Sequence, residues 1–264
     1  MHIGSLFPQL IIFSQWLLAE LIRKKIGQQY LFIQPHITQK NPKENTMSLK
    51  NTQKIKCPDC GTEGEFTIWQ SINTKLNPQA KENLLSGKLF AYTCPKCKKV
   101  HYVNYGLLYH QMEKQLMIYY AISKEDEKEI LDTFDKMENG DMLPGMESTD
   151  YTLRVVHSQN QLREKAYIFD MGLDDRVVEI MKVMMVAHLS QTNPDLEVGD
   201  IFLEITKGKP ERFVIRLKNG VLGNSPFAKK VYDAVKAEYI DSKGDGKRDY
   251  IVDMNWAVEC LKNK

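Results

Sequence analysis

Four cysteines, arranged in two matching motifs, are the side chains of this protein best suited to chemistry. The motif Cys-Pro-x-Cys occurs at residues 57–60 and again at residues 94–97. Two residues between the cysteines of a pair allow both thiolates to reach one ion, and two such pairs complete a tetrahedral shell. The sequence therefore predicts one structural zinc ion, held by Cys57, Cys60, Cys94 and Cys97.

The residues that flank the cysteines favour tight turns. Proline after the first cysteine of a pair fixes φ at that corner, and both motifs have it, as Pro58 and Pro95. Gly61 follows the first motif and suits the left-handed backbone conformation that such turns often need. Lys98 occupies the equivalent position after the second motif, so we expect the two turns to be imperfectly matched.

The two motifs are unusually far apart in the sequence. The stretch between Cys60 and Cys94 has 33 residues, against about 15–20 in the compact form of this zinc motif. A strand and a helix inserted between the motifs account for the excess. Because four cysteine ligands leave no open coordination position, we expect the site to stabilise the fold rather than to catalyse a reaction.

Two other chemistries could use the same cysteines. A thioredoxin-like redox centre places its cysteine pair at a strand-to-helix turn, whereas the first pair here precedes a predicted strand. Iron also binds tetrahedral thiolate sites, so the sequence leaves both zinc and iron open. His101 lies four residues after Cys97 and could replace one ligand, although four cysteines already complete the shell.

The segments that position the cysteines are predicted to be mainly β-strands, because they are rich in β-forming residues. The predicted strands are residues 66–73, 88–94, 100–105 and 114–122, and residues 106–113 connect the last two. A short helix interrupts them: Asn77 suits its N-cap, Pro78 its first position and Gly87 its end.

The second half of the chain is predicted to alternate helices and strands. Ser123 caps a helix whose first turn is acidic. The elements expected after it are a linker (138–149), a strand (150–158), two helices with a break near Gly172 (160–195), a β-hairpin (200–220), a helix that begins with Ser225 and Pro226 (225–240), and a strand that runs into a turn or short helix (249–261).

The helix after Gly172 combines apolar and charged residues. Its apolar positions cover most of its circumference, which predicts a helix that is buried or covered by a partner. Asp174 and Asp175 suit its N-cap, and Glu179 and Lys182 are expected to be charges on its surface. The fifth cysteine, Cys260, is expected to be buried.

The first 46 residues differ from the remainder. Residues 6–22 form an apolar run that five polar or helix-breaking residues interrupt, and basic residues 23–25 follow it. This pattern fits neither a signal peptide nor an uninterrupted membrane-spanning helix. We expect translation to begin at the internal Met47, which would make residues 1–46 a non-native extension. A membrane-tethering helix and an amphipathic packing helix are the alternatives.

The composition is that of a soluble globular protein. The chain has 264 residues, of which 42% are hydrophobic and 27% charged, enough for a packed core. The net charge of +2 divides into a mildly basic block that contains the cysteine pairs and a mildly acidic remainder, an asymmetry too weak to indicate a dense nucleic-acid-binding face. Five cysteines, an odd number, argue against a secreted disulfide framework. We therefore expect a cytoplasmic protein, with a membrane contact only if residues 6–22 insert.

A basic face beside the motifs supports a second functional hypothesis. Its residues are Lys54, Lys56, Lys96, Lys98 and Lys99, with Tyr102 and Tyr105 nearby. Basic grooves that interleave aromatic residues bind single-stranded nucleic acid. Nucleic acid therefore remains an alternative to protein as the partner.

Several stretches together point to a known family. They are IKCPDCGTEGEFTIWQSIN, NPQAKENLLSGKLFAYTCPKC, YGLLYHQMEKQLMIYY and, downstream, LREKAYIFDMGLDDRVVEIMK. Over about residues 55–182 the chain resembles the CpXC domain family of bacterial proteins, which is named for its two Cys-Pro-x-Cys motifs. The resemblance implies the four-cysteine metal site and a bacterial cytoplasmic protein. The family's function is uncharacterised, so it supplies neither a substrate nor a catalytic residue.

These features predict an α+β protein. A zinc-ribbon-like, β-rich unit with an inserted helix, residues 47–122, precedes an α/β remainder, residues 123–264, that contains a β-hairpin and helices and packs on it. The leading hypothesis is a zinc-stabilised, non-catalytic protein that binds another macromolecule, with protein as the expected partner. Nucleic-acid binding is the second. The third is an enzyme with its site in residues 123–264, which would require a polar pocket with convergent carboxylates there.

Overall fold

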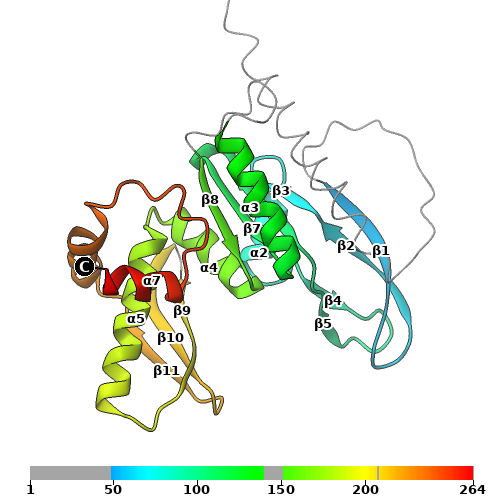
Figure 1. Cartoon of the computed structure of the whole chain (residues 1–264). Helices are drawn as coiled ribbons and strands as arrows, with labels where there is room; N and C mark the ends of the chain where they lie inside the picture. The colour runs from blue at the N-terminus through cyan, green and yellow to red at the C-terminus, as the bar shows by residue number, and fades with distance from the viewer. Residues whose placement is uncertain (1–48, 140–150, 207, 264) are drawn as a thin grey trace, which may run out of the picture. The chain divides into compact units, whose positions relative to one another are not determined.

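The computed structural model of the chain describes residues 49–139, 151–206 and 208–263 (Figure 1). The chain divides into two compact units, Met1–Tyr151 and Thr152–Lys264. The domain bounds expected from the sequence, with a division after residue 122, stay a prediction. The N-terminal segment 1–46 and most of the expected linker lie outside the described residues.

The first unit consists of short strands and two helices. Its elements are β1 (Lys50–Lys56), β2 (Glu63–Trp69), β3 (Ser71–Asn73), α2 (Pro78–Leu85), β4 (Ala91–Thr93), β5 (Val100–Tyr102), β6 (Leu107–Gln111), a 3-10 turn (Met112–Lys114), β7 (Leu116–Tyr120) and α3 (Lys124–Glu138). β1 and β2 form one antiparallel hairpin, and β4 and β5 form another. β6 lies between β3, with which it is parallel, and β7, with which it is antiparallel.

The core of the first unit forms where strands and helix α3 share apolar faces. Every residue of β6 and β7 is buried. Helix α3 buries Ile130, Phe134 and Met137, which lie on one face at a helical spacing. The Ser123 side chain caps this helix by accepting a hydrogen bond from the Asp126 N–H, as the sequence predicts.

Two strand predictions in this unit were wrong. Residues 107–111, expected as a connection, form the buried strand β6. Its polar residues disguise the strand in the sequence, and the structure gives them partners: His110 Nε2 lies 3.0 Å from Tyr151 Oη. The single strand expected over residues 66–73 breaks at Gln70, where the N–H groups of Gln70 and Ser71 both donate to the Leu49 carbonyl.

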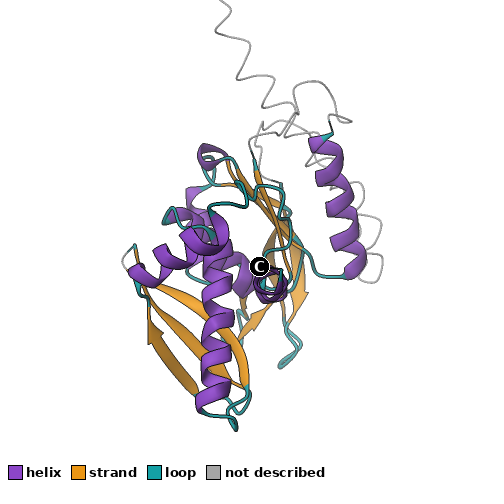
Figure 2. Cartoon of the chain, turned by 60° about the vertical axis from the view of Figure 1, so that its left-hand side comes forward, coloured by secondary structure: helices purple, strands orange, loops and turns teal. Residues whose placement is uncertain are grey.

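The second unit contains helices, a three-stranded antiparallel sheet and strand β8 (Thr152–Val156), which lies outside that sheet. Its other elements are α4 (Gln159–Asp170), α5 (Asp175–Thr192), β9 (Val198–Thr206), β10 (Lys209–Leu217), β11 (Leu222–Pro226), α6 (Lys229–Val235), a π-helical turn (Lys236–Ile240) and α7 (Met254–Lys262). The expected hairpin is confirmed as β9 and β10, and β11 extends the sheet beside β10. The long helix α5 crosses this sheet in Figure 2, and the core between them contains Val177, Ile180, Leu203, Phe213 and Ile215.

The starts of the helices in the second unit agree only in part with the predictions. Asp174 caps α5 as expected, because its side chain accepts from the Arg176 N–H. Ser225 and Pro226 do not start a helix; they end β11, opposite Phe213 and Arg212, at an edge strand where proline is tolerated. In the final segment the expected short helix is confirmed as α7, whereas the strand expected before it does not form over residues 249–253. Among the described helices, none combines the length and apolar character that crossing a membrane requires.

Candidate metal centre

The first cysteine pair lies in the turn that joins β1 to β2. The Cys57 N–H donates to the Thr62 carbonyl at 2.9 Å, and the Gly61 N–H donates to the Cys57 carbonyl at 2.9 Å. These two backbone bonds close the turn around Cys60. Both cysteines therefore project from one rigid corner at the end of the first hairpin.

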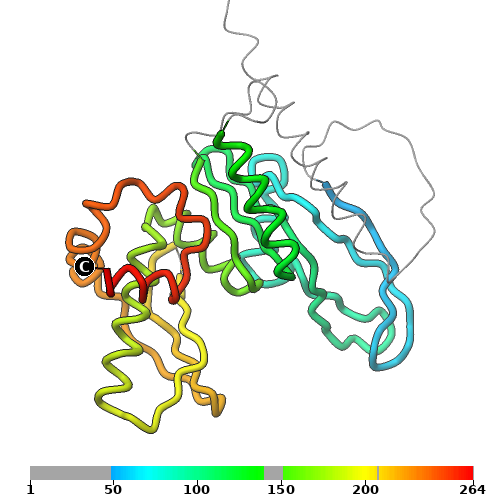
Figure 3. The backbone as a smooth tube through the Cα atoms, in the orientation of Figure 1, coloured from blue at the N-terminus to red at the C-terminus, as the bar shows by residue number. Residues whose placement is uncertain are grey.

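The second cysteine pair repeats this geometry between β4 and β5. The Cys94 N–H donates to the Lys99 carbonyl at 3.0 Å, and the Lys98 N–H donates to the Cys94 carbonyl at 3.1 Å. Figure 3 traces the two hairpins to their turns, which lie side by side. A motif that is repeated in the sequence thus becomes two matching halves of one site.

The two turns share one backbone conformation in spite of their different sequences. Gly61 has a φ of +69° and Lys98 has a φ of +61°. The expected mismatch between the turns is therefore wrong for the backbone, because Lys98 itself adopts the left-handed conformation. A non-glycine residue is strained there by about 1–2 kcal/mol, so the turn hydrogen bonds must hold Lys98 in place.

We expect glycine substitution at this lysine to stabilise the metal-loaded first unit. Lys98→Gly removes the Cβ that makes the left-handed conformation costly, and should raise the free energy of unfolding by about 0.5–1 kcal/mol. Gly61→Ala is the matched control and should lower the free energy of unfolding by about 1–2 kcal/mol. This loss would come from backbone strain, because only the flexible end of Lys56 lies near the added methyl group. Unfolding in urea, monitored by the release of the metal, measures the stability of both variants. Equal stabilities for all three proteins would contradict the turn geometry.

The four sulfur atoms converge on one point. All four lie within 4.8 Å of one another, and two contacts cross between the turns: Cys60 Sγ to Cys94 Sγ is 3.5 Å and Cys57 Sγ to Cys97 Sγ is 3.6 Å. Four sulfurs at about 2.3 Å from a central zinc ion would lie about 3.8 Å apart. None of these cysteines forms a disulfide. The arrangement fits a tetrahedral four-thiolate ion site.

The thiols perturb one another's ionisation. Hydrogen bonds from Thr62, first from its side chain and then from its backbone, lower the pKa of Cys60 to about 6. The backbone hydrogen bond from Lys99 lowers the pKa of Cys97, but burial and the neighbouring thiols outweigh it and raise this pKa to about 12. Thiolates this close repel one another, so the cluster does not carry four negative charges alone. A divalent cation at the centre would supply the charge that allows all four thiols to ionise.

Three polar side chains, His101, Asp59 and Lys99, form an arm of linked contacts that lies against Cys57. His101 Nε2 is 3.5 Å from Cys57 Sγ and 3.1 Å from Asp59 Oδ2. Lys99 Nζ binds the other Asp59 oxygen at 2.6 Å. His101, considered from the sequence as a substitute ligand, therefore lies beside the site, in a second group of possible ligands with Cys57 and Asp59. Asp59 could not be identified from the sequence, because its partner Lys99 is 40 residues away.

The lysines proposed as a nucleic-acid-binding face are largely matched by carboxylates. In the β1–β2 register Lys54 lies opposite Glu65, and Lys56 lies opposite Glu63. Directly opposite residues of an antiparallel pair share one face of the sheet, so these lysines face acidic side chains. Lys99 is ion-paired with Asp59. The basic character expected from the sequence is thus partly neutralised in the fold.

The remaining members of that face differ in accessibility. Lys96 and Lys98 are exposed in the second turn. Tyr102 is 70% exposed, whereas Tyr105 is buried against Phe90. Burial raises the pKa of Tyr105 above its usual value. Only one of the two tyrosines is therefore available to stack on a ligand.

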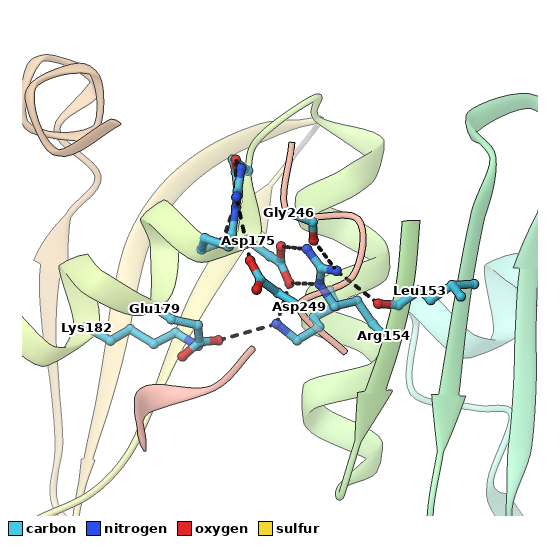
Figure 4. A network of polar contacts seen from close by, with 10 residues as sticks. Leu153, Arg154, Asp175, Glu179, Lys182, Gly246 and Asp249 are labelled. Atoms are coloured by element: carbon cyan, nitrogen blue, oxygen red, sulfur yellow. Dashed lines mark hydrogen bonds and ion pairs between the residues drawn. The ribbon is translucent and has the colours of Figure 1, made fainter. Parts of the chain in front are cut away.

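A buried charge network occupies the second unit (Figure 4). Its members are Arg154, Glu164, Lys165, Asp175, Glu179 and Lys182. Each of these side chains is at most 6% exposed. The expectation that Glu179 and Lys182 are helix-surface charges was therefore wrong. Asp175, expected near the N-cap, is fully buried one residue inside the helix.

Asp175 is the centre of one half of this network. Arg154 binds both of its carboxylate oxygens, through Nε at 2.8 Å and Nη2 at 2.9 Å, and Lys165 Nζ binds at 2.7 Å. Burial raises the pKa of Asp175, but the two adjacent cations outweigh it and hold this pKa below its usual value. Arg154 also donates to the carbonyl of Gly246 at 3.0 Å. The carboxylate therefore connects β8, α4 and α5.

Lys182 is the centre of the other half. Its Nζ lies 2.7 Å from Glu164 Oε2 and 3.0 Å from Glu179 Oε1. Burial lowers the pKa of Lys182, but Glu164 and Glu179 outweigh it and raise this pKa above its usual value. The second Glu164 oxygen accepts from the Leu203 N–H at 2.6 Å. Three cations thus balance three anions inside the unit, and the network ties α4 and α5 to β9.

A signal for this network was present in the sequence. Positions 175, 179 and 182 recur at a helical spacing, on a helix whose other positions are mostly apolar. When apolar residues cover most of the circumference of a helix, the helix is buried, and its charged residues are buried with it. Buried charges in turn require partners, and Glu164 and Lys165 on the preceding helix supply them.

Comparison with known proteins links the part of the chain that contains the cysteine pairs to a protein family. A family model described as CpXC protein matches residues 55–182, a range that contains both cysteine pairs and ends at Lys182. No curated protein and no solved structure matches the chain. Over this matched range, in which the two Cys-Pro-x-Cys turns join in one cluster, the chain is a member of the CpXC protein family.

Proposed function

We propose that the four cysteines hold one zinc ion and that this ion stabilises a module that binds another protein in the cytoplasm. The observation that carries the metal site is the crossing of sulfur contacts between the two turns, at 3.5 and 3.6 Å. Four thiolates close the coordination shell, so the ion has no position for a substrate. Its role is to join two hairpins that are separated in sequence by a helix.

Zinc and iron both suit four thiolates, so the identity of the ion needs a direct test. Elemental analysis of protein purified without added metal is expected to give about one zinc per chain. An iron–thiolate site would instead absorb visible light and give one iron per chain. Iron at full occupancy would replace zinc in this proposal and leave the four-cysteine site intact.

The second unit favours a structural over a catalytic role for its carboxylates. An enzyme with its site there would need carboxylates that converge on a substrate. Carboxylates do converge, as Glu164, Asp175 and Glu179, but each is buried and bound to a cation. Such groups have no hydrogen-bonding capacity directed toward solvent, and they serve to hold α4 and α5 together.

Exposed apolar side chains beside the metal turns support protein binding. Val100 is 52% exposed and Tyr102 is 70% exposed. They are two residues apart on β5, so they lie on the same face of this strand. Within the described residues β5 pairs with β4 alone. Large apolar and tyrosine side chains at an accessible strand are typical anchors of protein interfaces.

Substitution of these anchors tests the protein-binding proposal. Tyr102→Ala should reduce recovery of a specific partner in affinity capture from the native host by at least about tenfold, as expected for an interface anchor, with metal content unchanged. Leu76→Ala is the matched control, because Leu76 is also apolar and 47% exposed in the same unit. Equal recovery of the partner with wild type and with Tyr102→Ala would contradict the proposal that this surface binds a protein.

Nucleic-acid binding is the alternative that the same capture experiment distinguishes. Tyr102 with Lys96 and Lys98 forms an exposed aromatic and basic group, which is a minimal stacking platform. Binding through these residues should weaken steeply as salt rises. Retention of single-stranded DNA or RNA at low salt, lost in Tyr102→Ala, would favour this alternative over a protein partner.

A further inference from the structure

We infer that His101 donates a hydrogen bond to the Cys57 thiolate and thereby slows the release of the metal, without itself being a ligand. The inference rests on the proposed metal site and goes beyond it, since it assigns a role to a side chain outside the four cysteines. It concerns His101, Asp59, Lys99 and Tyr92, which lie around one side of Cys57.

The surroundings of His101 Nε2 determine where its hydrogen lies. This atom is 3.5 Å from Cys57 Sγ and 3.1 Å from Asp59 Oδ2. A metal-bound thiolate has no proton, and an ionised carboxylate is an acceptor only. Nε2 must therefore carry the hydrogen. A ring nitrogen that carries hydrogen has no lone pair for a metal, which rules out Nε2 as a ligand in this arrangement.

The position of the histidine ring is fixed from two sides. His101 lies opposite Tyr92 in the β4–β5 register, and the two rings stack with centroids 6.5 Å apart and planes inclined by 28°. Asp59 is held on its other side by Lys99 at 2.6 Å. Both constraints come from the second hairpin, while Cys57 and Asp59 belong to the first. The arm therefore links the two halves of the site independently of the ion.

This arrangement affects the metal through the charge on sulfur. Four thiolates around a dication carry a net charge of −2, and metal release begins when a sulfur detaches or is protonated. A hydrogen bond to the thiolate stabilises the charged, metal-bound form of that sulfur. Partners that hydrogen-bond to ligands in this way typically contribute about 10–100-fold to metal affinity. Cys57 is buried, so a hydrogen bond to its sulfur is stronger than it would be in water.

Metal transfer to a chelator tests the inference. The full chain is loaded with Co²⁺, and loss of its thiolate absorption is followed after addition of excess chelator. His101→Phe keeps an aromatic ring against Tyr92 but removes the donor, and should release cobalt about 10-fold faster than wild type. His101→Gln keeps an N–H donor and should stay within about threefold of the wild-type rate. His188→Phe, the same substitution at an exposed histidine of α5, is the control and should release cobalt at the wild-type rate.

The cobalt spectrum separates the possible failures. The absorption bands before chelator is added should be the same in wild type and His101→Phe, because the four sulfur ligands are unchanged. Altered bands in His101→Phe would mean that His101 is a ligand. An unchanged release rate in His101→Phe would mean that its hydrogen bond has no effect. Either result would overturn the inference about His101 and leave the metal site intact. Equal, fast release from His101→Gln and His101→Phe would also overturn it. A wild-type chain that binds no cobalt would overturn the metal site itself.

Discussion

Cys57→Ser is expected to abolish stable metal binding and to unfold the hairpins of the first unit. Structural zinc contributes about 10–16 kcal/mol of apparent binding free energy to small metal-dependent folds, and loss of one of four thiolates removes a large part of it. We expect bound metal to fall more than tenfold under chelator competition, and the first unit to lose at least about 3 kcal/mol of stability. Hydrogen exchange of β1, β2, β4 and β5, together with metal content, measures both effects.

The fifth cysteine provides the control for this prediction. Cys260 is buried in the core of the second unit, among residues of α5 and α7. Cys260→Ala should therefore leave metal stoichiometry at the wild-type value and keep β1, β2, β4 and β5 protected. The four-cysteine site would be contradicted if Cys57→Ser retained full metal content and thermal stability, or if Cys260→Ala lost metal.

Asp175→Asn is expected to destabilise the second unit by about 3–5 kcal/mol. The substitution keeps the shape of the side chain but removes the negative charge that balances Arg154 and Lys165, which bind it at 2.7–2.9 Å. Two buried cations would then lack their main partner, and an uncompensated buried charge is costly. Because these cations hold the folded-state pKa of Asp175 below its usual value, its stabilising contribution is present at neutral pH and is lost as acid protonates it.

Labelling of Cys260 reports on this unit separately from the metal site. Urea should expose Cys260 to a thiol reagent at a lower concentration in Asp175→Asn than in wild type, with peptide mass analysis locating the label. Asp200→Asn is the matched control: the same chemical change at an ion pair with Arg216 in which both side chains are 53% exposed. An exposed pair contributes at most about 1 kcal/mol. A loss below about 1 kcal/mol in Asp175→Asn would contradict the network's role.

The metal ligands could be predicted from the sequence because their chemistry is encoded locally. Two residues between paired cysteines and a proline at each corner specify a turn, and two such turns specify one ion. The helix between them was likewise marked by Pro78 at its start and Gly87 at its end. Asn77 occupies the N-cap position but makes no side-chain hydrogen bond there, so the helix depends on its other signals.

The features that the sequence did not reveal depend on contacts between distant residues. Strand β6 was missed because His110 and Gln111 interrupt its apolar pattern, and their partners appear only in the fold. The buried charges of α5 were taken for surface charges because Arg154 and Lys165, which neutralise Asp175, come from other elements. Local periodicity gives the face of a helix but not what lies against it.

X-ray absorption at the metal edge, on protein purified without added metal, tests the central claim most directly. The four-cysteine site predicts about one zinc ion per chain, surrounded by four sulfur atoms at about 2.3 Å. Cys57→Ser should lose this signal, whereas Cys260→Ala should retain it. A shell with fewer than four sulfurs would contradict the claim. Less than one tetrahedrally bound metal per chain would also contradict it, and would make thiol redox chemistry the better explanation of the two Cys-Pro-x-Cys turns.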